Sequence, residues 1–268
     1  MRTLAERVAV VTGGGSGIGR ALCLAFARAG ARVVIADVDE AGMAATAEAV
    51  TKAGSRAIAV RTDVSRLADV QALADRAWAD FGAVHVLCNN AGIALWGGLD
   101  IATHQDWEWA ISVNLWGVVH GVETFVPRMI AQRSEGHIVN TASMAGLIAS
   151  EGLGVYNTTK YAVVGLSETL QKDLRRHGIG VSVLCPMGVT TRIRDSARSR
   201  PAALRNAGGE AEGPAVELIG RYLTPEHVAD RVLAAILADR LYVITHREGL
   251  EPLRRRFARM EKAIEESQ

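Results

Sequence analysis

The chain has 268 residues and a formal net charge of +1, and 49% of the residues are hydrophobic. This length and composition favour one domain with a large core over two domains. Acidic and basic residues are interspersed, which gives no reason to expect nucleic acid as a partner. The start of the chain lacks a signal-peptide pattern, and no apolar stretch approaches the roughly 20 residues that span a membrane. We therefore expect a cytoplasmic protein with no membrane partner.

Three cysteines, Cys23, Cys88 and Cys185, lie far apart in apolar contexts. Their spacing fits neither a zinc site nor a disulfide framework. The histidines show no metal-ligand spacing either, so no catalytic metal is expected. The cysteines are expected to be buried thiols in a reducing compartment.

Short apolar strands alternate with helices along the first two thirds of the chain. Strands are expected at 7–12, 32–36, 56–61, 84–88, 137–142 and 180–185, and helices at 17–29, 40–53, 66–81, 105–132 and 155–176. This alternation predicts an α/β fold with a parallel sheet covered by helices on both faces. Right-handed crossovers then make it a Rossmann-like, doubly wound sheet, whose ligand crevice lies at the carboxyl ends of the strands.

Residues 187–223 interrupt this alternation with prolines, glycines and many arginines. A loop this long in a compact domain is usually functional or disordered. Its arginines could meet an anionic substrate, although a solvated loop is the simpler interpretation. A helix near 225–239, capped by Thr224, a strand at 241–244 and a charged C-terminal helix at 250–268 follow. They complete a single domain over residues 1–268.

A glycine-rich turn, TGGGSGIG at residues 12–19, follows the first strand and begins the first helix. Gly13, Gly17 and Gly19 allow a tight turn and a close approach of the backbone to a ligand. The N-terminus of the helix presents free N–H groups and a positive dipole end to a pyrophosphate. The spacing departs from the common dinucleotide motif at Ile18, and a simple strand-to-helix turn remains the alternative.

Asp37 ends the second strand, 20 residues after Gly17. A carboxylate there can accept hydrogen bonds from both ribose hydroxyls of adenosine and would repel a 2′-phosphate. The neighbouring positions hold Ser16 and Val38, which supply no cation for such a phosphate. The pattern predicts NAD rather than NADP. The alternative is that Asp37 only caps the next helix.

Tyr156 and Lys160 are four residues apart and therefore share one face of a helix. A lysine about 4 Å from a phenol would favour the phenolate by about 4 kcal/mol, which is about three pKa units. The phenol of Tyr156 would then titrate near the working pH, where it could act as a general acid and base.

Taken together, these motifs resemble the short-chain dehydrogenase/reductase family over residues 8–191. The resemblance rests on TGGGSGIG at 12–19, Asp63-Val64, NNAG at 89–92, Asn114, Ser143, and Tyr156 with Lys160. It implies an NAD-dependent alcohol dehydrogenase or ketoreductase. The alternatives are other chemistry on the same scaffold (an epimerase, dehydratase or enoyl reductase) and a non-catalytic NAD-binding regulator.

The resemblance also implies roles for single residues. Ser143 is expected to bind the substrate oxygen, Tyr156 to transfer the proton and Lys160 to hold the nicotinamide ribose. Asn114 is expected to kink its helix and to hold a water beside Lys160. The expected cofactor contacts are Gly13, Ser16, Gly17, Ile18, Gly19, Asp37, Asp63, Val64, Asn90, Ala91, Gly92, Tyr156, Lys160, Val189 and Thr191.

The positions that line the substrate cavity in this family are apolar in this chain. They include Leu95, Trp96, Ala145, Leu153 and Met187, the last at a position where the family usually has glycine. Such a wall favours a hydrophobic secondary alcohol or ketone, of the cyclic, aryl or terpenoid kind. The resemblance further implies a homo-oligomer. The C-terminal strand lacks the glycine-rich ending of many tetrameric members, so both a dimer and a tetramer remain possible.

The segment 190–223 follows directly on residues expected to contact the nicotinamide. Its composition buries little apolar surface, so its folded state should be marginal without ligand. We expect it to be a mobile substrate-binding loop, in which residues around 192–215 become ordered when cofactor and substrate bind.

Overall fold

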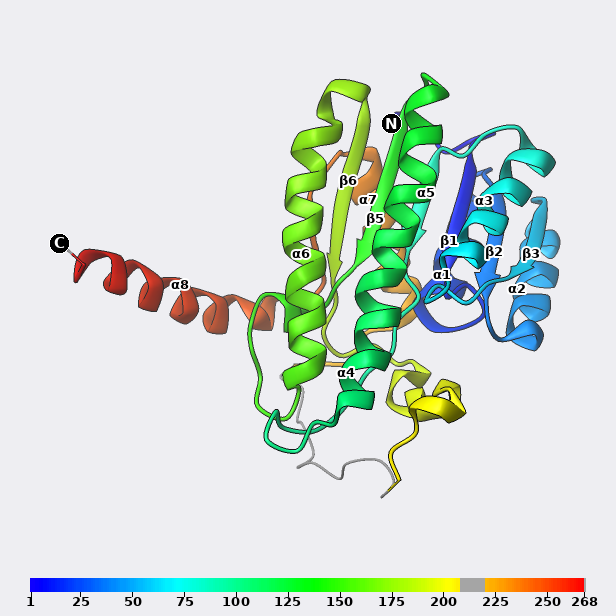
Figure 1. Cartoon of the computed structure of the whole chain (residues 1–268). Helices are drawn as coiled ribbons and strands as arrows, with labels where there is room; N and C mark the ends of the chain where they lie inside the picture. The colour runs from blue at the N-terminus through cyan, green and yellow to red at the C-terminus, as the bar shows by residue number, and fades with distance from the viewer. Residues whose placement is uncertain (208–219, 268) are drawn as a thin grey trace.

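The computed structural model describes residues 1–207 and 220–267. These residues form a seven-stranded parallel sheet in the order β3-β2-β1-β4-β5-β6-β7 (Figure 1). The strands are β1 (Val8–Thr12), β2 (Arg32–Asp37), β3 (Ala57–Arg61), β4 (Val86–Asn89), β5 (Gly136–Thr141), β6 (Ile179–Cys185) and β7 (Tyr242–Ile244). The predicted doubly wound α/β fold is confirmed. In the described part of the chain, no helix combines the length and the apolar character needed to cross a bilayer.

Helices connect the strands and cover both faces of the sheet (Figure 1). They are α1 (Gly17–Arg28), α2 (Glu40–Lys52), α3 (Leu67–Phe81), α4 (His104–Ile111), α5 (Gly117–Ala131), α6 (Gly154–Leu174), α7 (Pro225–Leu237) and α8 (Leu250–Glu265). The predicted cap of α7 is confirmed, since the side chain of Thr224 accepts a hydrogen bond from the backbone of His227 at the start of that helix.

Two hydrophobic clusters lie on the two faces of the sheet. Alternate residues of each strand feed alternate clusters, because successive side chains of a strand point to opposite faces. Ala9 and Val11 of β1 pack with Phe26 of α1, on the side that also holds α7. Val10 packs with Phe125 of α5 on the other side. Burial on both faces explains why the strands are continuous apolar runs in the sequence.

The strand order reverses between β1 and β4, and this is where ligands bind in open α/β sheets. Asn90, just after β4, fixes this edge. Its side-chain nitrogen donates to the Thr12 carbonyl oxygen at 3.0 Å, and its backbone N–H donates to the Thr12 hydroxyl at 2.9 Å. The Thr141 hydroxyl donates to the side-chain oxygen of Asn90 at 3.3 Å. The ends of β1, β4 and β5 are thereby held together.

The described part of the arginine-rich segment, residues 192–207, is packed against the body of the protein. It forms two short 3-10 helices, η4 (Arg192–Ser199) and η5 (Ala202–Leu204). Ser196 accepts a hydrogen bond from the backbone of Ala94, and Arg200 is 2% exposed. The interpretation of a solvated loop is therefore wrong for Arg200. Residues 208–219 of the predicted loop lie outside the described residues, and the mobility expected for 192–207 stays a prediction.

A buried ion pair connects this segment to α4. The guanidinium of Arg200 lies 2.7 Å from the carboxylate of Asp106. Asn206 donates to the same carboxylate at 3.0 Å, and Thr103 donates to the side-chain oxygen of Asn206 at 2.8 Å. Burial by itself would raise the pKa of Asp106, but its hydrogen bonds with Thr103, Asn206 and Arg200 outweigh burial and lower the pKa. Asp106 therefore stabilises the fold above the usual carboxyl pKa of about 3.9 and loses this contribution as pH falls through the lowered value.

We predict that Arg200→Ala loosens residues 192–207 and leaves the sheet intact. Removal of one partner leaves the buried carboxylate of Asp106 without its cation, which typically costs about 3–5 kcal/mol. Hydrogen exchange read by mass spectrometry should show faster exchange in 192–207 in this variant. Arg205→Ala, an exposed arginine of the same segment, is the matched control and should exchange like the wild type. Equal protection in the two variants would contradict the anchoring role of Arg200.

Candidate functional site

Two cavities adjoin at the carboxyl ends of the strands. The larger, of about 590 Å³, lies over the glycine-rich turn, and the smaller, of about 460 Å³, lies between η2 (Met144–Gly146) and the start of α8. Five residues line both cavities: Ile18, Tyr156, Pro186, Thr191 and Ile193. A molecule in one cavity can therefore meet a molecule in the other beside these residues.

The glycine-rich turn forms the floor of the larger cavity. Gly13 and Gly17 have positive φ angles of 66° and 51°, which residues other than glycine adopt only with strain. A Cβ atom on Gly19 would collide with the carbonyl oxygen of Gly13. The turn therefore needs glycine at these positions, and it leaves the N-terminus of α1 facing the cavity.

Asp37 also lines the larger cavity, at the end of β2. Its carboxylate accepts hydrogen bonds from the backbone N–H groups of Gly15 at 2.9 Å and Asp39 at 3.0 Å. The cap of α2 is Asp39, whose side chain accepts from the backbone of Gly42. The alternative that Asp37 only caps this helix is therefore wrong. Its carboxylate is held at the cavity wall beside Val38.

Most of the residues predicted to contact a cofactor line the larger cavity. These are Gly13, Ser16, Gly17, Ile18, Gly19, Asp37, Asp63, Val64, Asn90, Ala91, Gly92, Tyr156, Lys160 and Thr191. Val189 lines the smaller cavity instead. Two cations, Arg192 and Arg198, also line the larger cavity, whereas the sequence analysis assigned the arginines of this segment to an anionic substrate or to solvent. Arg192 directly follows Thr191, and this adjacency was the available signal. Its guanidinium lies 3.3 Å from the carboxylate of Asp39, which follows β2 by two residues.

Three predicted catalytic residues divide between the cavities. Ser143 lines only the smaller one, Lys160 only the larger one, and Tyr156 both. The ammonium group of Lys160 donates to the Thr141 carbonyl oxygen at 3.0 Å and lies 5.5 Å from the ring centroid of Tyr156. The hydroxyl oxygen of Ser143 accepts from the backbone of Ala145 at 3.1 Å. The helical spacing of Tyr156 and Lys160 thus places both side chains on the wall of the larger cavity.

Burial shifts the pKa of both members of this pair. It lowers the pKa of Lys160 to about 8 and raises the pKa of Tyr156 to about 12, while a hydrogen bond with Ser143 acts against the rise at Tyr156. The predicted phenol pKa near the working pH is therefore wrong for the polypeptide by itself. The reason is that burial dominates, because the ammonium group of Lys160 bonds to a backbone carbonyl and not to the phenol.

Asn114 lies in a π-helical turn, η1 (Ser112–Trp116), between α4 and α5. The single helix predicted over 105–132 is therefore interrupted in its first half. The fully buried side chain of Asn114 accepts a hydrogen bond from the backbone N–H of Ile93 at 2.9 Å. It donates to the carbonyl oxygen of Ile93 at 3.0 Å and to the Thr159 hydroxyl at 3.2 Å. A Cβ atom on Gly92 would lie 3.2 Å from the side-chain oxygen of Asn114 and 3.4 Å from the ammonium nitrogen of Lys160. Single π turns often mark functional sites.

The smaller cavity has a mostly apolar wall. Of the residues predicted to line it, Trp96, Ala145, Leu153 and Met187 do so. Leu95 does not, because it packs in a core cluster with Trp109 and Val155 while its neighbour Trp96 faces the cavity. The sequence analysis missed two carboxylates of this wall, Glu151 and Glu248. Among the described lining residues there is no lysine, arginine or histidine.

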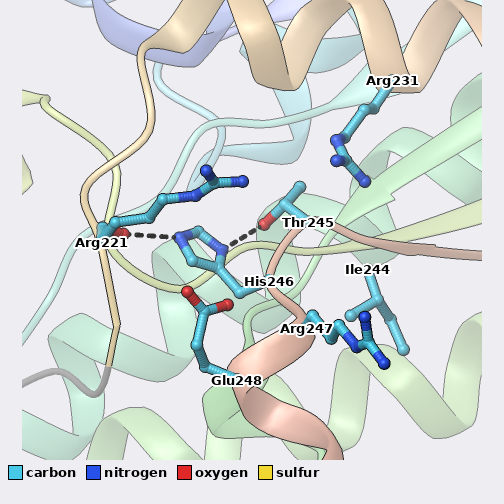
Figure 2. A pocket seen from close by; sticks show the side chains of 7 residues that line it. All are labelled: Arg221, Arg231, Ile244, Thr245, His246, Arg247 and Glu248. Carbon is cyan, nitrogen blue, oxygen red and sulfur yellow. Dashed lines mark hydrogen bonds between the residues drawn. The ribbon is translucent and has the colours of Figure 1, made fainter.

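A third cavity, of about 520 Å³, lies beside the smaller one and shares Glu248 with it (Figure 2). Arg221, Arg231 and Arg247 surround it, and the buried ring of His246 hydrogen-bonds to the carbonyl oxygen of Arg221 at 3.0 Å. Hydrogen bonds from the backbone N–H of Glu248 itself and from that of Arg221 lower the pKa of the Glu248 carboxyl. Glu248 is thus held as a carboxylate between an apolar and a basic cavity.

Comparison with known proteins places this arrangement in one class, the dehydrogenases built on a Rossmann-like sheet. A model of the short chain dehydrogenase family matches residues 7–202. The chain is 43% identical to a short-chain dehydrogenase/reductase from Burkholderia phymatum whose crystal structure is a complex with NAD, with a TM-score of 0.91 over 98% of this chain and 97% of that one.

Two similar proteins are also named as dehydrogenases. The chain is 36% identical to a C alpha-dehydrogenase of Sphingobium sp., over 94% of this chain and 85% of that protein. It is 36% identical to a 1-deoxy-11-beta-hydroxypentalenate dehydrogenase of Streptomyces exfoliatus, over 95% of this chain and 88% of that protein. The chain therefore belongs to the short-chain dehydrogenase/reductase family of oxidoreductases.

Proposed function

We propose that this oxidoreductase is an NAD-dependent alcohol dehydrogenase or ketoreductase that acts on a hydrophobic secondary alcohol or ketone. The observation that carries the proposal is the position of Tyr156, which lines both cavities, with Ser143 on the apolar side and Lys160 on the other. A residue that moves a proton on a substrate held against a cofactor must reach the boundary between their sites. Tyr156 satisfies this requirement.

The larger cavity fits NAD. The N–H groups at the start of α1 and the cations Arg192 and Arg198 suit the negative charge of a pyrophosphate. The carboxylate of Asp37 suits the two hydroxyls of an unphosphorylated ribose, with Asp63 and Val64 beside the adenine. When bound, NAD supplies the hydride acceptor and, in its oxidised form, a positive charge.

The side chains at the junction have complementary tasks. The Ser143 hydroxyl donates a hydrogen bond to the substrate oxygen, and the Tyr156 hydroxyl oxygen takes the proton of an alcohol or returns it to a ketone. The ammonium group of Lys160 would hold the nicotinamide ribose, and together with the positive charge of the oxidised cofactor it would favour the phenolate form of Tyr156 against the effect of burial. Asn114 orients the wall beside Lys160 through its bonds to Ile93 and Thr159.

The smaller cavity favours a neutral, apolar substrate. Its volume of about 460 Å³ falls within the usual range for small-molecule sites, and its wall is mostly apolar. Glu151 and Glu248 add negative charge, which would repel a carboxylate or phosphate on the substrate.

We also infer that the enzyme works in the cytoplasm as a homo-oligomer. Three free, buried thiols, at Cys23, Cys88 and Cys185, suit a reducing compartment. Ile244 on the edge strand β7 is 38% exposed, and such edges are commonly covered by another chain.

The first prediction of this proposal concerns the cofactor. Because Asp37 repels a 2′-phosphate, kcat/KM should be at least about tenfold higher with NAD than with NADP, or about 1.4 kcal/mol. The variant Asp37→Ala with Val38→Arg should shift the preference toward NADP. Steady-state rates with the two cofactors give the measurement. Equal activity of the wild type with both cofactors would contradict the role of Asp37.

The second prediction concerns the proton. Tyr156→Phe keeps the ring but removes the hydroxyl, so kcat should fall by at least about 10²-fold while NAD binding persists. Ser143→Ala should also lose activity, because the substrate oxygen loses its donor. Tyr161→Phe, on the same helix, is the matched control and should keep near-native turnover. NADH formation measures turnover, and cofactor fluorescence measures binding. Near-native turnover of Tyr156→Phe would favour a non-catalytic NAD-binding role.

The third prediction concerns substrate charge. A neutral hydrophobic secondary alcohol should have a kcat/KM at least about tenfold higher than its analogue carrying a carboxylate, or about 1.4 kcal/mol. Glu151→Gln combined with Glu248→Gln should narrow this ratio, because the repulsion is removed. A panel of cyclic, aryl and terpenoid alcohols, each with a carboxylated analogue, provides the test. A double variant with an unchanged ratio would show that the two carboxylates do not select the substrate.

A further inference from the structure

The C-terminal helix α8 leaves the body of the protein beyond α6 and extends away from it (Figure 1). None of its 16 residues is buried. Within the described part of the chain, only the base of this helix has contacts with the body: Gly249 and Pro252 line the smaller cavity, and the guanidinium of Arg256 lies 5.3 Å from the ring centroid of Tyr161. An isolated helix of this length is marginal in water, and most helices gain stability by packing an apolar face. α8 therefore needs a partner for the part beyond its base.

Its apolar residues form a narrow stripe. They are Leu250, Leu253, Phe257, Met260 and Ile264, at successive spacings of three and four residues. This is the a and d pattern of a heptad repeat, which brings one seam of a helix against another helix. Phe257 is 48% exposed, Met260 47% and Ile264 66%. The stripe is thus uncovered at its outer end, and its spacing fits another helix better than a flat surface.

The charges of α8 are divided along its length. Residues 250–259 contain four arginines and one glutamate, whereas residues 260–267 contain three glutamates and one lysine. A parallel pair of such helices would place like charges side by side. An antiparallel pair would place the basic half of each helix against the acidic half of the other. The helix is therefore complementary to itself in the antiparallel direction.

The residues beside the stripe refine this arrangement. Ion pairs join Arg255 to Glu251 within α8, and Lys262 to Glu266 at its C-terminal end, on the face away from the stripe. Arg254 and Glu261, by contrast, flank the stripe seven residues apart, at the same heptad position. Among the described residues neither has an ion-pair partner.

We propose that α8 pairs antiparallel with α8 of a second copy of this chain. Leu253 then packs against Ile264 of the second copy and Phe257 against its Met260, with the reverse contacts made by symmetry. Arg254 faces Glu261 of the second copy across the edge of the seam. The C-terminal end of each helix then lies beside the base of the other, next to the substrate cavity of the second copy. This surface is independent of the proposed reaction.

The test compares the solution mass of the full chain with that of two variants, by light scattering and sedimentation equilibrium. Phe257→Glu with Met260→Glu should break the seam and roughly halve the mass. Ala258→Glu with Lys262→Gln makes the same change in net charge on the opposite face and should keep the wild-type mass. Circular dichroism and thermal melting verify that each variant is folded. A seam variant with the wild-type mass would overturn the proposal.

A charge exchange tests the direction of pairing and does not depend on the seam variant. Arg254→Glu should weaken self-association, and adding Glu261→Arg in the same chain should restore it, because the two residues face each other only in the antiparallel pair. Failure of the second substitution to restore association would overturn the antiparallel arrangement. Sedimentation with vesicles of anionic phospholipid is the last arm. Vesicle binding that depends on Phe257 and Met260, without any change in solution mass, would show that the stripe serves a lipid surface instead.

Discussion

The hydrogen bonds of Asn90 are the constraint on which the site depends. They join the ends of β1 and β4, where the strand order reverses, and Thr141 extends the connection to β5. The glycine-rich turn follows the first of these strands and Ser143 follows the last. Backbone carbonyls at the ends of parallel strands would otherwise need water or ligand as partners. The half-buried amide side chain of Asn90 satisfies the Thr12 carbonyl and holds the strand ends between the two cavities in place before any ligand binds.

Charged side chains are buried in two places, and the energetic cost of burying them is offset differently in each. Asp106 and Arg200 offset each other as a hydrogen-bonded pair. Among the described residues Lys160 has no such counter-charge: its ammonium group bonds to the Thr141 carbonyl, and burial lowers its pKa to about 8. A paired charge stabilises the position of a segment, whereas an unpaired one stays available to a ligand. The two buried cations therefore have different uses, one in packing and one in the site.

The sheet, the order of its elements and most of the cofactor cavity could be predicted, because those features are local in the sequence. A strand buried on both faces is a continuous apolar run, and the glycine-rich turn and the Tyr156–Lys160 spacing each occupy one short segment. Contacts between distant segments leave no such pattern. Arg200 and Asp106 are 94 residues apart, and Glu248 reaches the substrate cavity from beyond the arginine-rich segment. The capping role considered for Asp37 belongs to Asp39, two residues later, and only the backbone partners of the two carboxylates reveal this.

The two cavities draw on different parts of the chain. The floor of the larger one comes from the first strands, whereas Glu248, Gly249 and Pro252, near the end, complete the smaller one. Gly249 lies so close to η2 that a Cβ atom on it would collide with the side chain of Met144. A change in the sequence of the C-terminal segment would therefore alter the wall of the smaller cavity and leave the glycine-rich floor of the larger one unchanged.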